Sequence, residues 1–138
     1  MFYVPNLPYA FYLAARAKHS AFFSAANPCI KSSGNGTESK YYTTQLIPEE
    51  SRPKTILVTD YKDVISKIKN IGISFPLIAK PDVGYRGLLV QKIHTEKAMK
   101  LYLEKYNIPI LIQEFLESTY ECGIFYQRKP NEKKGKIS

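Results

Sequence analysis

The chain has 138 residues, of which 44% are hydrophobic and 23% are charged, and this balance excludes an intrinsically disordered chain. Its length allows one domain with its own core and is short for two domains of ordinary size. The net charge of +8 favours anionic partners. Because most of the basic residues are scattered, the phosphates of a small nucleotide explain this charge as well as a nucleic acid does.

The cysteines and the N-terminus indicate the compartment. Cys29 and Cys122 follow no metal-ligand spacing, and we expect both to be reduced, with Cys122 in the core because it lies within an apolar run. The apolar stretches near the N-terminus are too short to span a bilayer, and Met1 to Leu7 lacks the charge that begins a signal peptide. The sequence therefore predicts a cytoplasmic protein without membrane contact.

Residues 1–53 are less regular than the rest of the chain. They predict a helix from Pro8 to His19, a turn-rich loop from Ser32 to Gly36, and a short helix from Glu38 to Leu46. We expect this segment to be an N-terminal part and linker, followed by one lobe at 54–130 and a loose polar tail at 131–138.

From residue 54 onward, the apolar pattern alternates between strands and helices. Strands are predicted at 55–59, 75–79, 88–93 and 108–115, and less clearly at 121–128. One helix, capped by Asp60 and ended by Gly72, would bury Val64, Ile65, Ile68 and Ile71. A second helix, capped by Thr95, would bury Ala98, Met99, Leu101, Tyr102 and Tyr106. The short hairpin between the second and third strands favours an α+β fold, with helices packed on one face of an antiparallel sheet.

The hairpin at 75–93 carries the first candidate chemistry. Lys80 ends a buried strand, where an ammonium is costly unless it meets an anion. The loop that follows contains Gly84 and Gly87, whose backbone N–H groups can approach a phosphate closely. The alternative is a lysine that reaches solvent from a strand edge beside an ordinary turn.

The end of the strand at 108–115 carries the second candidate feature. The strand is apolar on both faces until Gln113 and turns acidic at Glu114, where freed backbone groups could pair with a planar heterocycle such as adenine. Glu121 opens the next run, and its carboxylate could accept hydrogen bonds from ribose hydroxyls. The alternative is that Glu114 and Glu117 are simply solvated carboxylates at a strand end.

Taken together and in this order, these features resemble the ATP-grasp superfamily, most closely the lineage of D-alanine–D-alanine ligase and related carboxylate–amine ligases. The resemblance rests on Phe75-Pro-Leu-Ile-Ala-Lys80-Pro, the loop to Gly87, the strand ending Gln113-Glu114-Phe115-Leu116, and Glu121.

The resemblance implies a role for each of these parts. Lys80 would contact the α- and β-phosphates of ATP, and the loop Asp82 to Gly87, with Gly84, Tyr85, Arg86 and Gly87, would close over the triphosphate. Glu114 to Leu116, after Gln113, would form the adenine-binding hinge, and Glu121 would hold the ribose. Lys40 is the candidate for a second phosphate-contacting lysine; the alternative is a lysine at a helix start that faces water.

The same resemblance implies that the Mg²⁺ ligands and the acyl-phosphate-stabilising arginines lie beyond this chain. We therefore expect part of an ATP-dependent carboxylate–amine ligase, inactive alone, with exposed apolar surface and possible self-association. No nucleic acid is expected as a partner, although a small basic nucleic-acid-binding module and a non-catalytic interaction domain stay open as alternatives.

Overall fold

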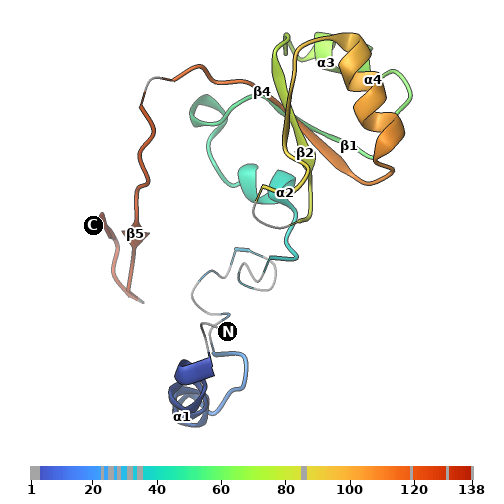
Figure 1. Cartoon of the computed structure of the whole chain (residues 1–138). Coiled ribbons are helices and arrows are strands. Elements are labelled where there is room, and N and C mark those ends of the chain that lie inside the picture. The colour runs from blue at the N-terminus through green and yellow to red at the C-terminus, as the bar shows by residue number, and fades with distance from the viewer. Residues whose placement is uncertain are drawn as a thin grey trace.

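The computed structural model describes residues 4–22, 24, 27, 29–30, 33, 36–84, 87–118, 120–129 and 131–137. At its centre, a four-stranded antiparallel sheet in the order β1–β4–β2–β3 carries α3 and α4 on one face (Figure 1). The strands are β1 (Thr55–Val58), β2 (Leu77–Pro81), β3 (Gln91–Ile93) and β4 (Ile110–Glu114); the helices are α3 (Val64–Asn70) and α4 (Glu96–Lys105). The predicted α+β fold is confirmed.

The remaining elements lie outside this sheet. The N-terminal part has η1 (Val4–Asn6), α1 (Leu7–Ala17), α2 (Lys40–Thr44) and η4 (Glu49–Ser51). The two helices predicted there are thus confirmed: α1 begins one residue earlier and ends two residues earlier than predicted, and α2 is two residues shorter at each end. Among the described residues, no helix has both the length and the apolar character that a bilayer span requires.

The C-terminal part departs from the predictions. Its only regular structure in the described residues is a small hairpin of β5 (Tyr126–Gln127) and β6 (Lys136–Ile137), so the predicted strand at 121–128 is much shorter and the tail contains a strand. Cys122 is exposed rather than buried, because its segment leaves the central sheet instead of joining it (Figure 1). Both cysteines are free, as predicted.

The core lies between the sheet and the two helices. The strand registers place one row of side chains, including Ala79 and Ile112, on the face beneath α3 and α4. β4 lies between β1 and β2, and its residues Ile110, Leu111 and Ile112 are fully buried. This is the predicted strand that is apolar on both faces, and its central position explains that composition.

The start of α3 corrects one predicted cap. The Asp60 carboxylate accepts the backbone N–H of Lys62 at 3.1 Å, within a turn before the helix. The N-cap position belongs instead to Asp63, which takes a left-handed conformation with φ 56°. Asp60 is thus engaged by a local turn, a competing role that aspartate fills as readily as a cap. Gly72, at φ 70°, ends the helix as predicted.

The returning strand of the hairpin starts later than predicted, at Gln91. Residues 87–89 form a turn, and Leu89 has a left-handed φ of 61°. The hydroxyl of Tyr102 on α4 donates to the Leu89 carbonyl at 2.7 Å, which stabilises this conformation through a tertiary contact. Burial, followed by the neighbours Tyr106 and Tyr61, raises the pKa of Tyr102 to about 12, so the hydroxyl keeps its proton.

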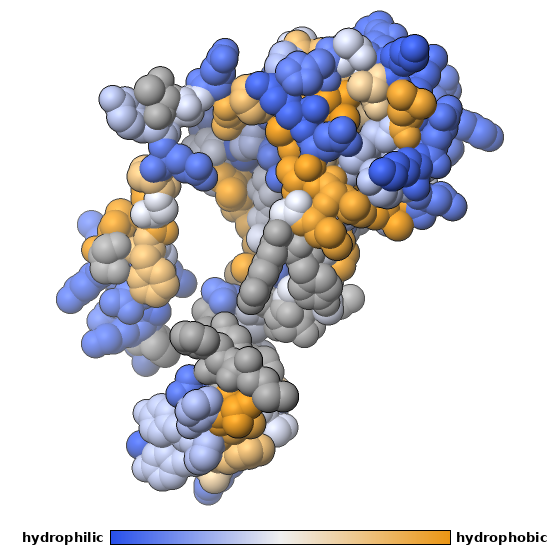
Figure 2. All heavy atoms as spheres, viewed as in Figure 1, coloured by the Kyte–Doolittle hydropathy of each residue, from blue (hydrophilic) through white to orange (hydrophobic). Residues whose placement is uncertain are grey.

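Large apolar side chains remain exposed at the surface, as the sequence predicted. Figure 2 shows them beside the sheet and around α1. They include Tyr9 and Phe11 on α1, Leu88 in the hairpin loop, and Leu116 and Phe125 after β4.

The buried face of α4 differs from the prediction at two positions, Leu101 and Leu103. Met99, Tyr102 and Leu103 are buried, whereas Leu101 is 57% exposed. The buried positions follow the helical spacing of three and four residues, and Leu101 lies outside that stripe.

This difference gives a matched test on one helix. Leu103→Ala should lower the free energy of unfolding by about 2–5 kcal/mol, because it removes a buried side chain and leaves a cavity. Leu101→Ala, the same change on the exposed face, should stay within about 0.5 kcal/mol. Urea unfolding measures both, and equal effects would contradict the observed orientation of α4.

Candidate functional site

Lys80 lies on the face of the sheet that α3 and α4 leave free. In β2, Leu77, Ala79 and Pro81 are buried, and the alternate residues Ile78 and Lys80 are half-buried on the opposite face. The Lys80 ammonium donates to the side-chain oxygen of Gln113 on the neighbouring β4 at 2.9 Å. The predicted strand-end lysine therefore holds a fixed position on an otherwise apolar strand.

The charge of Lys80 is stabilised only in part. Burial lowers its pKa below the ordinary lysine value, and the positive charge of Lys40 lowers it further. Both effects disfavour the ammonium, and an anion placed between the two lysines would reverse them. Perturbed groups of this kind mark candidate binding sites.

Helix α2 brings Lys40 to the same place. Ser39 caps the helix by accepting the Tyr42 N–H at 3.2 Å. The Lys40 ammonium donates to the backbone carbonyls of Asp82 and Gly84, each at 3.1 Å. Lys40 therefore reaches the glycine loop after β2 instead of facing water, although it is far from that loop in the sequence.

Asp82 joins α2 to the end of β2. Its side chain is only 4% exposed. Its carboxylate accepts the Tyr41 N–H at 2.8 Å and the Ser39 hydroxyl at 3.0 Å, while its backbone carbonyl accepts the Lys40 N–H at 3.1 Å. This role is not apparent from the sequence, which places Asp82 in the loop expected to close over the triphosphate. A Ser-Lys helix start has a recognisable cap, but nothing local shows that a distant aspartate completes it.

Gly84 and Gly87 of the glycine loop border this region. Gly87 has a φ of 79°, which favours glycine, and its carbonyl accepts the Val90 N–H at 3.2 Å to close the turn. A cavity of about 20 Å³ lies here, lined by Lys40, Lys80, Pro81, Gly84, Gly87, Leu88 and Val90. Four of the predicted phosphate-site residues thus line one small cavity; Tyr85 and Arg86 fall outside the described residues.

The other end of the sheet carries the predicted hinge. The Glu114 carboxylate accepts the Lys54 N–H at 2.8 Å, and the Glu114 N–H donates to the Lys54 carbonyl at 3.0 Å. The side chain of Glu114 is therefore hydrogen-bonded to the residue that precedes β1. This leaves backbone groups beyond Glu114 as the parts of the hinge that could contact a ligand.

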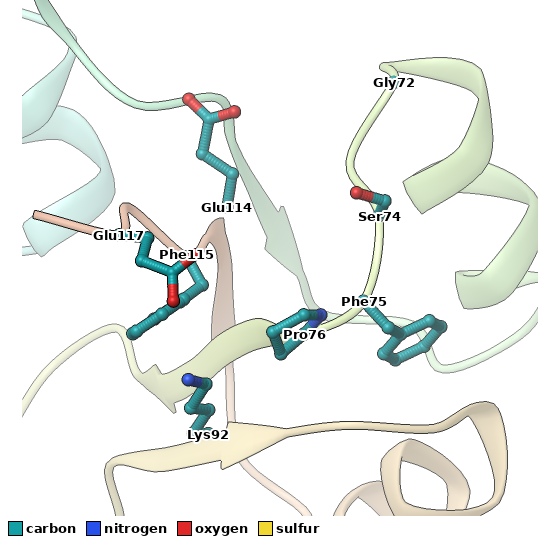
Figure 3. A pocket seen from close by; sticks show the side chains of 8 residues that line it. All are labelled: Gly72, Ser74, Phe75, Pro76, Lys92, Glu114, Phe115 and Glu117. Carbon is teal, nitrogen blue, oxygen red and sulfur yellow. The ribbon is translucent and has the colours of Figure 1, made fainter.

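A larger cavity of about 310 Å³ adjoins the hinge (Figure 3). Its lining residues are Gly72, Ser74, Phe75, Pro76, Lys92, Glu114, Phe115 and Glu117. The ammonium of Lys92 lies 3.5 Å from the centre of the Phe115 ring, a cation–π contact. Lys92 was not among the predicted site residues; the β2–β3 register pairs it with Ile78 and so places it on the face of Lys80. Leu116 and Glu121 are exposed and line neither cavity.

The two ends suit one elongated ligand. The register pairs Leu77 with Glu114 and Lys80 with Leu111, so the hinge and the paired lysines lie three residues apart along β2. At about 3.3 Å per residue this is about 10 Å, roughly the reach of a nucleotide from base to phosphates. Lys40 and Lys80 lie at one end, and the Phe115 ring with the larger cavity lies at the other.

A family model matches residues 37–125, and its description is the RimK-like ATP-grasp domain. The chain belongs to this ATP-grasp family. The matched range includes both lysines, the glycine loop, the hinge and Glu121, and the predicted superfamily is confirmed.

Comparison with curated proteins gave no match. Among solved structures, the chain is similar to the D-alanine–D-alanine ligase of Helicobacter pylori, with 21% identity and a TM-score of 0.49. The similar region covers 70% of this chain and 29% of that ligase, so the chain spans less than a third of its length.

The role of Asp82 can be tested without any ligand. Asp82→Ala should lower the free energy of unfolding by about 1–3 kcal/mol, because it removes the acceptor of a buried N–H and a hydroxyl. Asp82→Asn keeps an acceptor oxygen and should cost less. Hydrogen exchange at the Tyr41 amide should accelerate in the alanine variant and accelerate less in the asparagine variant. Unchanged exchange in both variants would contradict the hydrogen bond between the Asp82 carboxylate and the Tyr41 N–H.

Proposed function

We propose that residues 54–130, with the preceding helix that carries Lys40, form the nucleotide-binding lobe of an ATP-dependent ligase that activates a carboxylate as an acyl-phosphate and joins it to an amine. The observation that carries this proposal is the convergence of Lys40 and Lys80 on one cavity beside the glycine loop. Family membership supports ATP as the ligand. The carboxylate and the amine are substrates of the whole ligase.

At the phosphate end, the two ammonium groups supply charge and donors. Each ammonium has three N–H donors, and the hydrogen bonds described here use two from Lys40 and one from Lys80. The remaining capacity can go to the α- and β-phosphates. The loop from Gly84 through Tyr85 and Arg86 to Gly87 closes over the triphosphate in this proposal.

At the base end, the adenine lies against the hinge that follows Gln113. The backbone from Glu114 to Leu116 pairs with the edge of the base, and the Phe115 ring offers an aromatic surface beside it. The carboxylate of Glu121 holds the ribose. The cavity of about 310 Å³ lined by Glu114 and Phe115 supports this placement.

Mg²⁺ accompanies ATP in this proposal, and its ligands lie outside these residues. The described residues contain no group of three His, Cys, Asp or Glu side chains that could hold a metal ion. Their lysines fit the phosphates instead. Since phosphoryl transfer depends on metal-assisted charge neutralisation, we expect this lobe alone to bind ATP weakly and not to turn over.

The proposal also covers location and assembly. In this proposal the location is the cytoplasm, as the sequence predicts. Exposed apolar residues such as Phe11, Leu88 and Phe125 are candidates for burial against other parts of a larger ligase or a second copy.

Thermal unfolding with and without Mg-ATP tests nucleotide binding. At ten times the dissociation constant, ATP should stabilise the chain by about 1.4 kcal/mol and raise the midpoint by several degrees. Lys80→Ala and Lys40→Met should abolish most of the rise, whereas Lys62→Ala, at an exposed lysine, should preserve it. A midpoint that duplex DNA raises and ATP does not would favour the nucleic-acid-binding alternative; no response to either would favour an interaction domain.

The affinity for ATP should depend on pH through Lys80. ATP binds the ammonium form, so affinity falls as the pH rises through the pKa of Lys80, which burial and Lys40 hold below the ordinary lysine value. Calorimetric titrations over a pH series should show the decline before exposed lysines titrate. An affinity that stays constant until they titrate would exclude Lys80 as the phosphate contact.

A further inference from the structure

A series of hydrogen bonds extends from Lys80 on the face of the sheet opposite α3 and α4. The Lys80 ammonium donates to Gln113 Oε1 at 2.9 Å, and Gln113 Nε2 donates to the Thr55 hydroxyl oxygen at 3.1 Å. The Thr55 hydroxyl donates to the Pro53 carbonyl at 2.8 Å. Thr55 and Gln113 are directly opposite each other in the β1–β4 pair.

The direction of this series is fixed from its far end. A carbonyl only accepts, so the single proton of the Thr55 hydroxyl goes to Pro53. Toward Gln113 the hydroxyl can then only accept, and the amide must present its NH₂ group there. The Gln113 carbonyl is thereby turned toward Lys80, and an ammonium, which only donates, requires that orientation.

We propose that Gln113 is a positioning residue for Lys80. Thr55 orients the Gln113 amide, and Gln113 holds the Lys80 ammonium at the phosphate end of the site without neutralising its charge. This inference rests on the proposed function and assigns Gln113 a role other than direct contact with the nucleotide. Thr55 precedes the glycine loop and the hinge in the sequence, and its contact with Gln113 makes it part of the site.

The choice of a neutral acceptor has a chemical consequence. A carboxylate at position 113 would pair with Lys80 at hydrogen-bond distance and cancel the charge that the phosphates need. An apolar side chain would leave the long lysine free to sample other rotamers and would remove a partner from a half-buried ammonium. Glutamine accepts one hydrogen bond and leaves both the positive charge and two N–H donors available.

Thr55→Val is the decisive variant, because it keeps the branched shape and removes only the hydroxyl. Without that acceptor the Gln113 NH₂ group loses its partner, so the amide is no longer anchored and can move its carbonyl away from Lys80. The affinity for ATP should fall about tenfold, the cost of one hydrogen bond to a charged group, while the affinity for adenosine stays unchanged. Thr55→Ser restores the hydroxyl and should restore ATP binding.

A second readout does not depend on nucleotide. The pKa of Lys80 can be followed by NMR of ¹³Cε-labelled lysine, with the signal assigned by its loss in Lys80→Arg. Thr55→Val and Gln113→Leu should lower this pKa, because the ammonium loses its acceptor, and Gln113→Glu should raise it while weakening ATP binding. Thr55→Ser should give the wild-type value.

The outcomes separate the two proposals. A wild-type chain that binds no ATP would overturn the proposed function, and the Lys80 pKa series would still decide the role of Gln113. An unchanged Lys80 pKa in Thr55→Val would overturn the positioning role. Where ATP does bind, equal ATP affinity in Thr55→Val and wild type, or an equal loss for ATP and adenosine, would overturn it as well.

Discussion

The site depends on the buried carboxylate of Asp82, which fixes a distant helix to the end of a strand. A carboxylate with only 4% exposure is costly unless donors surround it, and Ser39 and Tyr41 provide a hydroxyl and an N–H. Helix α2 has five residues, too few to be stable in isolation, so its position comes from this contact rather than from its own propensity. Because Asp82 also directly follows β2, one residue places Lys40 beside Lys80.

That placement has an electrostatic cost. Two ammonium groups approach one cavity, and Lys40 lowers the pKa of the partly buried Lys80. A fold selected for stability alone would separate like charges or supply a carboxylate between them. Here Lys40 contacts backbone carbonyls and Lys80 contacts a neutral amide, so the positive charge is solvated but not cancelled. A polyanion is the ligand that such an arrangement suits, and local rules broken in this way are typical of functional sites.

The sequence predicted the structural features that depend on residues close together in the sequence. Periodicity located the central strands and helices, and a short glycine-containing connection gave the antiparallel hairpin around Lys80. The features that were predicted wrongly or not at all depend mainly on tertiary contacts. Leu89 takes a left-handed φ because Tyr102, on another element, binds its carbonyl. Asp60 and Asp63 compete for the same helix start, and propensity does not decide between them. No local signal could reveal Asp82 or Lys92, since each depends on which segments the sheet brings together.

The start of β1 links the two ends of the candidate site. Gln113 and Glu114 are consecutive on β4, so their side chains point to opposite faces of the sheet. Gln113 reaches Thr55 on one face, and the Glu114 carboxylate holds the Lys54 N–H at the edge. Residues 53–55 therefore lie behind both the phosphate end and the hinge, at the point where the N-terminal segment enters the lobe. A displacement of that segment would act on Lys80 through Gln113 and on the hinge through Glu114, so the geometry of the two ends is coupled through one short stretch of backbone.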